Sequence, residues 1–512
     1  MSTASRLISG SAASWVQIGV NMVFQVILLP IYLTHWDVVT YGVWISIQAL
    51  VSIITTLDFG HQEFLTYEFL RIGKEKPLEL SVCLWSGISI STLISILQIV
   101  SVLFFINSGT LPLLLGKSTL LSSSLIHEAG LILLLQSITW FICLSVSGSI
   151  FRVLGPFGYY PRMAWWNLFS SIVSSIAPIV AINLGADLLV TGITTACASV
   201  VFSIPLYIDL FRLLRREKIK FCYPSWKVGS KNFLHSLAIS GKGLLENARQ
   251  QGVRLVLVPL VGAAGLVAFS TMRTGANVAL QGVRTIINPL MPELMRFLSK
   301  RDQERVDASF GILWIVVVAI VAPALVVLQA FIEPLYHLWT RGQTTFDPLL
   351  FSILSLSILV YAVAQPAMAV VIGNNLLKPQ LMLSIAAAAI VIGGMLILVP
   401  KNGILGAGIS LLVAEIVATS GYKIVAQRWL REVGLLWPAH SSQVATTSVW
   451  IAAIAMAFMI WLPQIKWSIL ICSTLLLLWN AWRFWQVLPS FATQYAKKML
   501  IYLPGIKKIY NT

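Results

Sequence analysis

Apolar residues run through this chain in long segments that are interrupted by short polar loops. Counting segments of about 20 apolar residues, the length at which a helix crosses a bilayer, predicts fourteen membrane spans. Two of them, 237–261 and 265–291, are unusual because they carry charges. The others cover about 8–33, 41–65, 80–106, 129–151, 163–184, 188–211, 309–333, 347–373, 381–399, 404–427, 444–462 and 467–488. We therefore expect an all-α polytopic membrane protein with no soluble domain.

The two unusual spans carry six formal charges, five of them positive: Lys242, Glu246, Arg249 and Arg254 on the first, and Arg273 and Arg284 on the second. At 100° per residue, the first three fall within about 60° of one another on one helix face. Asn277 shares a face with the two arginines of the second span. An ionisable side chain inside a bilayer is costly unless it faces water or a partner. These spans thus predict a polar pathway for an anionic substrate.

Composition supports a chain that is solvated mostly by lipid. Hydrophobic residues make up 57% and charged residues 11%, and the mean hydropathy is +0.85. The five cysteines show no paired framework and no metal-ligand spacing, so we expect neither disulfides nor zinc.

The net charge of +16 has to be interpreted by its location. About 24 Lys and Arg residues lie in the loops and terminal segments on one side of the predicted spans, and 4 lie on the other side. Positive residues of short loops stay cytoplasmic, so both termini and the basic loop 212–231 are predicted to face the cytoplasm. The charge is then explained by topology and by attraction to anionic lipids, and no nucleic-acid partner is expected.

A faint internal repeat divides the chain. Ser9-Gly10 and Pro30 of the first span correspond to Ser240-Gly241 and Pro259 of the seventh, an offset of about 230 residues. We expect two lobes of six helices around a central cationic cavity. The predicted domains are an N-lobe 1–211, a basic linker 212–236, a C-lobe 237–427, two further spans in 428–488 and a basic tail 489–512.

Short motifs near the ends of the first two spans suggest a family. Leu33-Thr34-His35-Trp36-Asp37, Tyr41-Gly42-Val43-Trp44 and Leu57-Asp58-Phe59-Gly60 resemble the polysaccharide-exporting branch of the MOP superfamily, the Wzx-type flippases of lipid-linked oligosaccharides. The turn Gly262-Ala263-Ala264-Gly265, Arg273 and Pro289-Leu290-Met291-Pro292 fit the family pattern of the seventh and eighth spans. Flippases of the peptidoglycan precursor begin with an Arg-rich first span, whereas residues 1–33 of this chain contain a single arginine, Arg6.

The resemblance implies a MATE-like fold, alternating access, and an undecaprenyl-pyrophosphate-linked glycan such as an O-antigen unit that moves to the outer leaflet of a bacterial inner membrane. Polysaccharide polymerase or assembly proteins are candidate partners. No cofactor is expected, and coupling to H⁺ or Na⁺ is left open.

Candidate substrate-binding side chains follow from depth and from the polar faces. Arg249 and Arg273, near the middle, are the first choices, because arginine presents a planar fork to phosphate oxygens. An internal ion pair with Glu246 is the structural alternative for Arg249, and Lys242 and Glu246 could neutralise each other. Arg254 and Arg284 could instead extend to the interfaces. The remaining candidates are Asn277 and, from an uncharged polar stripe on the first span, Asn21 and Gln25.

A second group of candidates concerns coupling or gating. Asp58, with His61 and Glu63, is expected at the inner end of the second span, and Glu246 is a further candidate. A desolvated carboxylate can bind a proton in a useful pH range. The alternative is a carboxylate that closes a helix end against Arg6 or Arg71.

Other functional classes fit the residues less well. A multidrug exporter on the same scaffold would use carboxylates to bind cationic drugs, whereas five of the six charges on these spans are positive. A flippase of another lipid-linked precursor stays an alternative. A membrane glycosyltransferase or polymerase needs an acid–base or metal constellation and a sizeable loop. The chain shows neither, so we do not expect an enzyme.

Overall fold

The structure is a computed structural model that describes residues 3–115 and 122–489. Within them, the side chains of 3–12, 14, 249–250, 278–280 and 282–293 are not described. The described residues form helices and turns without a β-strand. The chain separates into two compact units, which are treated individually below. Unit 1 comprises Met1–Ser270, Trp339–Thr344 and Met395–Ile404, and unit 2 comprises Thr271–Leu338, Thr345–Gly394 and Leu405–Thr512.

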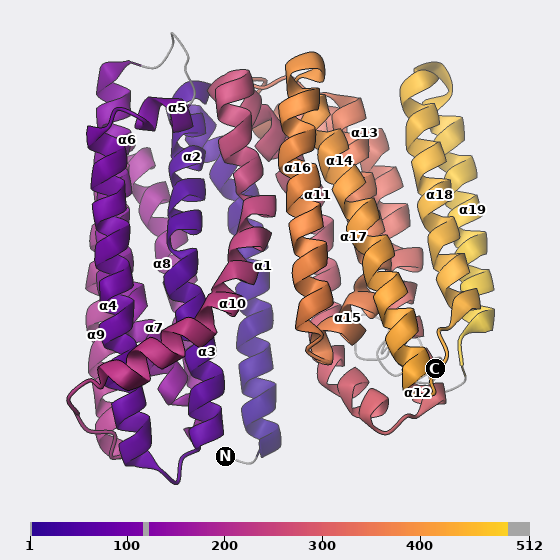
Figure 1. Ribbon diagram of the computed structural model, residues 1–512. Helices are drawn as coiled ribbons and strands as arrows, with labels where there is room; N and C mark the ends of the chain where they lie inside the picture. Colours follow the sequence, from indigo (N-terminus) through magenta and orange to yellow (C-terminus); the bar gives the residue numbers. More distant parts are fainter. Residues whose placement is uncertain (1–2, 116–121, 490–512) are drawn as a thin grey trace, which may run out of the picture. The chain divides into compact units, whose positions relative to one another are not determined.

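Unit 1 is built from long helices connected by short loops (Figure 1). In order these are α1 (Thr3–His35), α2 (Val38–Ile54), α3 (Thr56–Ile72), α4 (Pro77–Asn107), α5 (Leu111–Leu115), α6 (Ser123–Trp140), a π-helical turn (Phe141–Ser145), α7 (Val146–Val153), α8 (Tyr160–Asn183), α9 (Leu188–Arg216), α10 (Trp226–Gln250) and the first part of α11 (Gly252–Ser299).

Local sequence signals explain several helix ends. Asp37 caps α2 by accepting a hydrogen bond from the Thr40 N–H, and Asp187 caps α9 through the Val190 N–H. An acidic side chain at this position satisfies a backbone donor that has no partner within its own helix. In α11, Gly262 has φ +73° and interrupts the helical geometry. This is the expected small-residue turn, and glycine adopts such a φ without a steric penalty.

Two apolar clusters form much of the core of unit 1. One joins Tyr32, Trp36 and Trp44 with residues of α6 and α9. The other joins α3, α4, α7 and α9 around Phe69, Leu84 and Leu210. Because α1 packs against α8, and α3 packs against α4 and α10, helices that are distant in sequence surround these clusters.

Unit 2 contains the rest of α11 and the later helices. These are α12 (Gln303–Val316), a π-helical turn (Val317–Val321), α13 (Ala322–Thr340, whose last two residues belong to unit 1), α14 (Pro348–Val363), α15 (Gln365–Gly373), α16 (Leu377–Asn402, whose end belongs to unit 1), α17 (Ile404–Glu432, which begins in unit 1), α18 (Ala439–Trp461) and α19 (Lys466–Val487). The last two pack against each other, and α18 also packs against α14 and α12.

The expected all-α membrane fold is confirmed. Among the described residues, 11 helical segments are long and apolar enough to cross a membrane, or up to 13 if two bent pairs are each one span. One of the 11 is the 52-residue segment Trp226–Asn277, which contains the predicted seventh span and the start of the eighth. At about 1.5 Å per residue it is long enough for two crossings.

Two details differ from the expectation. The predicted helix 237–261 is divided near Gln251, where α10 ends and α11 begins, and α10 starts earlier, at Trp226. Residues 237–270, which we expected in the second lobe, belong to unit 1 because α10 packs along α3 and α4. The amphipathic pattern of α10 did not indicate which neighbour its uncharged face would contact.

Candidate functional site

One face of α10 is fastened to α3 by small and polar side chains. The Ser240 hydroxyl donates to the Leu57 carbonyl over 3.3 Å, and the Asn247 amide donates to the Thr56 hydroxyl over 2.7 Å. The Ser236 hydroxyl lies 3.3 Å from Nδ1 of His61. These α10 residues are spaced by four and seven positions, so they occupy one face of the helix.

The charged residues of α10 lie on its other side. At 100° per residue, Lys242 and Glu246 are rotated by about 200° and 240° from Ser240. Both side chains are half-buried, and neither is without a partner in the protein. Position 249 continues the same register, but the side chain of Arg249 lies outside the described residues, as does that of Arg284. The structure thus keeps the predicted stripe of α10 on the face away from α3.

Arg254 lies in the first part of α11, beside Tyr41 of α2, whose hydroxyl contributes to its electrostatic environment. Its Nε atom is buried and has no hydrogen-bond partner among the described residues. The Arg254 side chain as a whole is half-buried. It is held within unit 1, next to the aromatic cluster that Leu255 also contacts.

The remaining candidates are distributed over two helices. On α1, Asn21 is half-buried and Gln25 is exposed, while Gln17 of the same stripe donates to the Ser171 hydroxyl of α8 over 3.0 Å. In unit 2, Arg273 and Asn277 of α11 are half-buried, and Arg273 has a partner in the protein. Part of the α1 stripe therefore serves packing between helices.

A buried polar network surrounds Asp58, whose side chain is 0% exposed. Its Oδ2 accepts hydrogen bonds from Nε2 of Gln62 over 2.8 Å and from the Trp140 indole over 2.9 Å. Gln62 in turn accepts a bond from the Arg152 guanidinium over 2.8 Å. We call Asp58, Gln62, Trp140 and Arg152 the Asp58 network. It links the carboxylate to a cation through one amide, without a direct ion pair.

The other oxygen of Asp58 has a different environment. Oδ1 is buried and has no hydrogen-bond partner among the described residues, and the same is true of the Ser91 hydroxyl. The hydroxyls of Ser91 and Ser145 both lie close enough to influence the carboxyl. Ser145 ends the π-helical turn that follows Trp140. Short π-helical segments often occur at functional sites.

Asp58 lies close to a bend in the helical path. It lies in the first turn of α3, just after the break at Thr55 that bends the α2–α3 pair by 43°. At about 1.5 Å per residue, Asp58 is roughly 21 Å from the end of α3. Of its expected neighbours, His61 is buried and Glu63 is exposed.

The partners of Asp58 were not those that the sequence suggested. Arg71 pairs with Glu68 instead, and the Arg6 side chain lies outside the described residues. Gln62 was detectable from its spacing of four residues. Trp140 and Arg152 were not detectable from the sequence. Trp140 lies 82 residues from Asp58 and Arg152 lies 90 residues from Gln62, and both reach α3 only in the folded structure.

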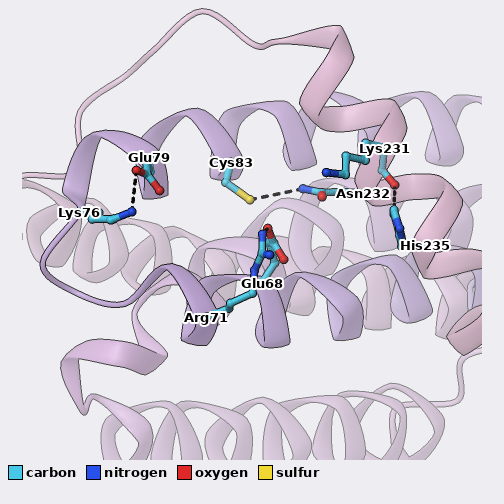
Figure 2. A network of polar contacts seen from close by, with 8 residues as sticks. All are labelled: Glu68, Arg71, Lys76, Glu79, Cys83, Lys231, Asn232 and His235. Carbon is cyan, nitrogen blue, oxygen red and sulfur yellow. Dashed lines mark hydrogen bonds and ion pairs between the residues drawn. The ribbon is translucent and has the colours of Figure 1, made fainter.

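A smaller cluster of polar residues lies where α3 ends and where α4 and α10 begin (Figure 2). Lys76 and Glu79 form an ion pair of 3.0 Å, and the Asn232 amide donates to Cys83 over 3.4 Å. A cavity of about 330 Å³ beside them has mostly apolar walls, including Ile72 and Leu78. Its charged neighbours Glu68, Arg71 and Glu79 are paired, so this cavity presents little free charge.

Comparisons with known proteins concern the fold. No family model and no curated protein matches the chain. The solved structure of the lipid II flippase MurJ in an inward closed conformation matches 92% of this chain and 98% of its own, with 15% identity and a TM-score of 0.66. An inward-facing multidrug resistance MATE transporter of the MOP superfamily matches 85% and 96%, with 16% identity and a TM-score of 0.62.

This chain has the fold of the MOP-superfamily transporters. A MOP-superfamily transporter from Pyrococcus furiosus, described as having a binding pocket of reverse polarity, matches 84% of this chain and 96% of its own, with 15% identity and a TM-score of 0.58. The expected MATE-like architecture is therefore confirmed, while the Wzx-type branch is not tested by these structures.

Proposed function

We propose that this protein is a flippase that moves an undecaprenyl-pyrophosphate-linked oligosaccharide, such as an O-antigen or another surface-polysaccharide unit, from the inner to the outer leaflet of a bacterial inner membrane. The observation that carries the proposal is the α10 stripe, where Lys242 lies on the face turned away from α3. A charged helix face that is turned away from the main packing partner is a candidate wall of a polar pathway.

The sign of the charges favours an anionic substrate. Five of the six charged residues on the predicted seventh and eighth spans are basic, and Arg254 lies inside unit 1 with an Nε that has no hydrogen-bond partner among the residues that the structure describes. A pyrophosphate offers several oxygens to such groups, and charge-assisted hydrogen bonds are strong where water is scarce. The likeness in fold to MurJ, a lipid II flippase, supports a lipid-linked substrate as well.

Two alternatives remain. The same fold is found in MATE exporters, and the protein could instead export a drug. Cationic drugs would need accessible carboxylates, whereas Asp58 is fully buried in unit 1. A flippase for a different lipid-linked cell-envelope precursor would use the same basic residues, so only the glycan would differ.

We further propose that Asp58 exchanges a proton during transport. A proton on the carboxyl removes the charge from a buried group whose Oδ1 has no hydrogen-bond partner among the described residues. An ionised carboxylate with only neutral donors on it is costly in a fully buried position. Arg152 of α7 belongs to the network, and the other titratable groups close to Asp58 along the chain are His61 and Glu63 on α3. Sodium at this carboxylate is the competing choice.

Binding to the purified protein in nanodiscs tests the substrate class. The ligands are an undecaprenyl-pyrophosphate-linked oligosaccharide, lipid II and a cationic drug. We expect the first to bind, and Lys242→Gln or Arg273→Gln to weaken it by roughly tenfold or more, because each removes a charged donor. Lys401→Gln, at an exposed helix end, is the matched control. Binding of the drug alone would contradict the proposal. Tighter binding of lipid II than of the oligosaccharide would make lipid II the preferred substrate.

A further inference from the structure

Pro30 leaves a backbone carbonyl of α1 without its intrahelical partner. This proline lies inside α1 and has no N–H, so the carbonyl of Val26, four residues earlier, cannot receive the usual helical hydrogen bond. Val26 is nine residues from the end of α1, about 13 Å along the helix axis. On the predicted first span, 8–33, Val26 lies inside the membrane, where a carbonyl without a donor costs free energy.

A residue more than 300 positions away satisfies this carbonyl. The indole N–H of Trp339 donates to the Val26 oxygen over 2.6 Å. Trp339 belongs to the segment Trp339–Thr344, which is part of unit 1 although the residues on both sides of it belong to unit 2. The bond therefore fills the gap that Pro30 creates.

The same segment satisfies a second carbonyl of α1. The Gln343 amide donates to the Leu33 oxygen, one of the last four carbonyls of a helix that ends at His35. These carbonyls lack intrahelical partners. A tight turn directs Gln343 to this place, since Arg341 and Gly342 both have positive φ, 53° and 69°, and the Gln343 N–H donates to the Thr340 carbonyl.

We propose that Trp339 and Gln343 form a latch on the end of α1 that closes in the state seen here and opens during the transport cycle. Both bonds are made by polar side chains to carbonyls that helix geometry leaves free. Because the residues that flank the segment belong to the other unit, movement of one unit against the other has to break these bonds or strain the chain at 338 and 345. On the expected topology, the latch lies at the outer side of the membrane.

The chemistry of the latch also limits when it opens. Once Trp339 leaves, the Val26 carbonyl needs another donor, which water or a hydroxyl group of the cargo can supply. Opening is thus favoured when a hydrated or hydroxyl-rich cargo reaches this part of α1. The latch itself does not depend on the identity of the transported molecule.

Pulsed electron–electron distance measurements in nanodiscs, without substrate, test the latch separately from the proposed function. Spin labels at His35→Cys and Arg341→Cys, both exposed, report the separation of α1 and the segment in a variant whose five natural cysteines are replaced. We expect a major short distance. Trp339→Phe keeps an aromatic ring but removes the N–H. It should raise the fraction of molecules with a longer label separation by roughly three- to tenfold, the change expected from the loss of one hydrogen bond.

Three further variants make the measurement decisive. Gln343→Leu should act in the same direction, and Trp461→Phe, an indole that is 73% exposed, should change nothing. Pro30→Ala supplies the missing N–H to Val26, so in this background Trp339→Phe should have a clearly smaller effect. An unchanged distance distribution in Trp339→Phe and Gln343→Leu, or an equal effect with and without Pro30, would overturn the latch.

A chemical lock distinguishes a latch from a static contact. Joining His35→Cys and Arg341→Cys with a short bifunctional thiol reagent should abolish transport, and reduction should restore it. Full transport by quantitatively cross-linked protein would show that the contact never opens. If the distances respond as expected but no anionic lipid-linked glycan is transported, the latch stands and the proposed function fails.

Discussion

Gly60 of α3 and Ser240 of α10 approach each other so closely that a side chain on Gly60 has no space. A methyl group there would lie 2.6 Å from Cα and 2.4 Å from Oγ of Ser240. The contact involves backbone, so it cannot be relieved by rotating a flexible side chain. It holds α10 in the orientation that turns Lys242 and Glu246 away from α3.

Gly60→Ala should therefore destabilise the protein. Forcing a methyl into a packed interface typically costs about 1–3 kcal/mol. Gly241→Ala is the matched control, because a methyl at Gly241 meets nothing within 4 Å, and alanine is the better helix residue. Thermal unfolding in detergent should show a lower transition temperature for Gly60→Ala and no decrease for Gly241→Ala. Equal transition temperatures for the two variants would contradict the tight α3–α10 contact.

Asp58→Asn should remove the pH dependence of transport if Asp58 exchanges a proton. Asparagine keeps the shape and can accept the Trp140 bond, but it cannot ionise. The measurement is initial transport rate against pH on both sides of the membrane, with protein amount as the control for folding. A well-expressed variant with a normal rate and an unchanged pH profile would exclude a protonation role. A profile that changes with Na⁺ and not with pH would assign the site to sodium.

Gly148→Ala tests the same network from its other end. A methyl at Gly148 would lie 2.1 Å from Oε1 of Gln62, so Gln62 has to leave both Asp58 and Arg152. We expect a shifted pH profile with the protein still folded. Gly155→Ala, where a methyl meets nothing within 4 Å, should leave the profile unchanged. Identical profiles for the two variants would show that Gln62 does not tune Asp58.

Cys222 provides a direct test of the predicted topology. This natural cysteine lies between α9 and α10, in the basic loop that we expect on the cytoplasmic side, and it is half-buried. In a variant that retains only Cys222, a membrane-impermeant maleimide should label the protein in lysed cells and not in intact cells. Labelling in intact cells would reverse the predicted orientation.

The spans and the charged pattern could be predicted from the sequence because they depend on length and local polarity. The predicted spans lie largely on helical residues, although 237–261 is divided between α10 and α11, and the turn near Gly262 follows from glycine alone. The Lys242–Glu246 stripe was likewise visible, because helical register determines it.

The side-chain partners could not be predicted in the same way. The bond between Asp58 and Trp140 and the bond between Val26 and Trp339 join residues that are far apart in sequence. Pro30 did indicate that one carbonyl of α1 would need a donor, but nothing local identified which residue would supply it. The placement of α10 on α3 similarly depends on the Gly60–Ser240 contact, which only the folded chain reveals.

The role of the charged stripe can be separated from a structural ion pair by a double-mutant comparison. If Arg249 only neutralises Glu246, then Arg249→Ala and Glu246→Ala should each lower the amount of protein, and the pair should restore it. If Arg249 binds the substrate, the pair should reach normal abundance while transport stays absent. Arg249→Lys should also impair transport, because lysine lacks the bidentate fork. Recovery of both abundance and transport in the pair would exclude a binding role for Arg249.

Translocation in proteoliposomes tests the central claim most directly. The purified protein is reconstituted with an undecaprenyl-pyrophosphate-linked oligosaccharide that carries a fluorophore on its glycan, and an impermeant quencher reports the outer-leaflet fraction over time. We predict translocation by the unaltered protein that exceeds protein-free liposomes, and a loss of roughly tenfold or more when Lys242→Gln and Arg273→Gln are combined. A rate equal to that of protein-free liposomes, or a rate that does not change when both charges are removed, would contradict the account.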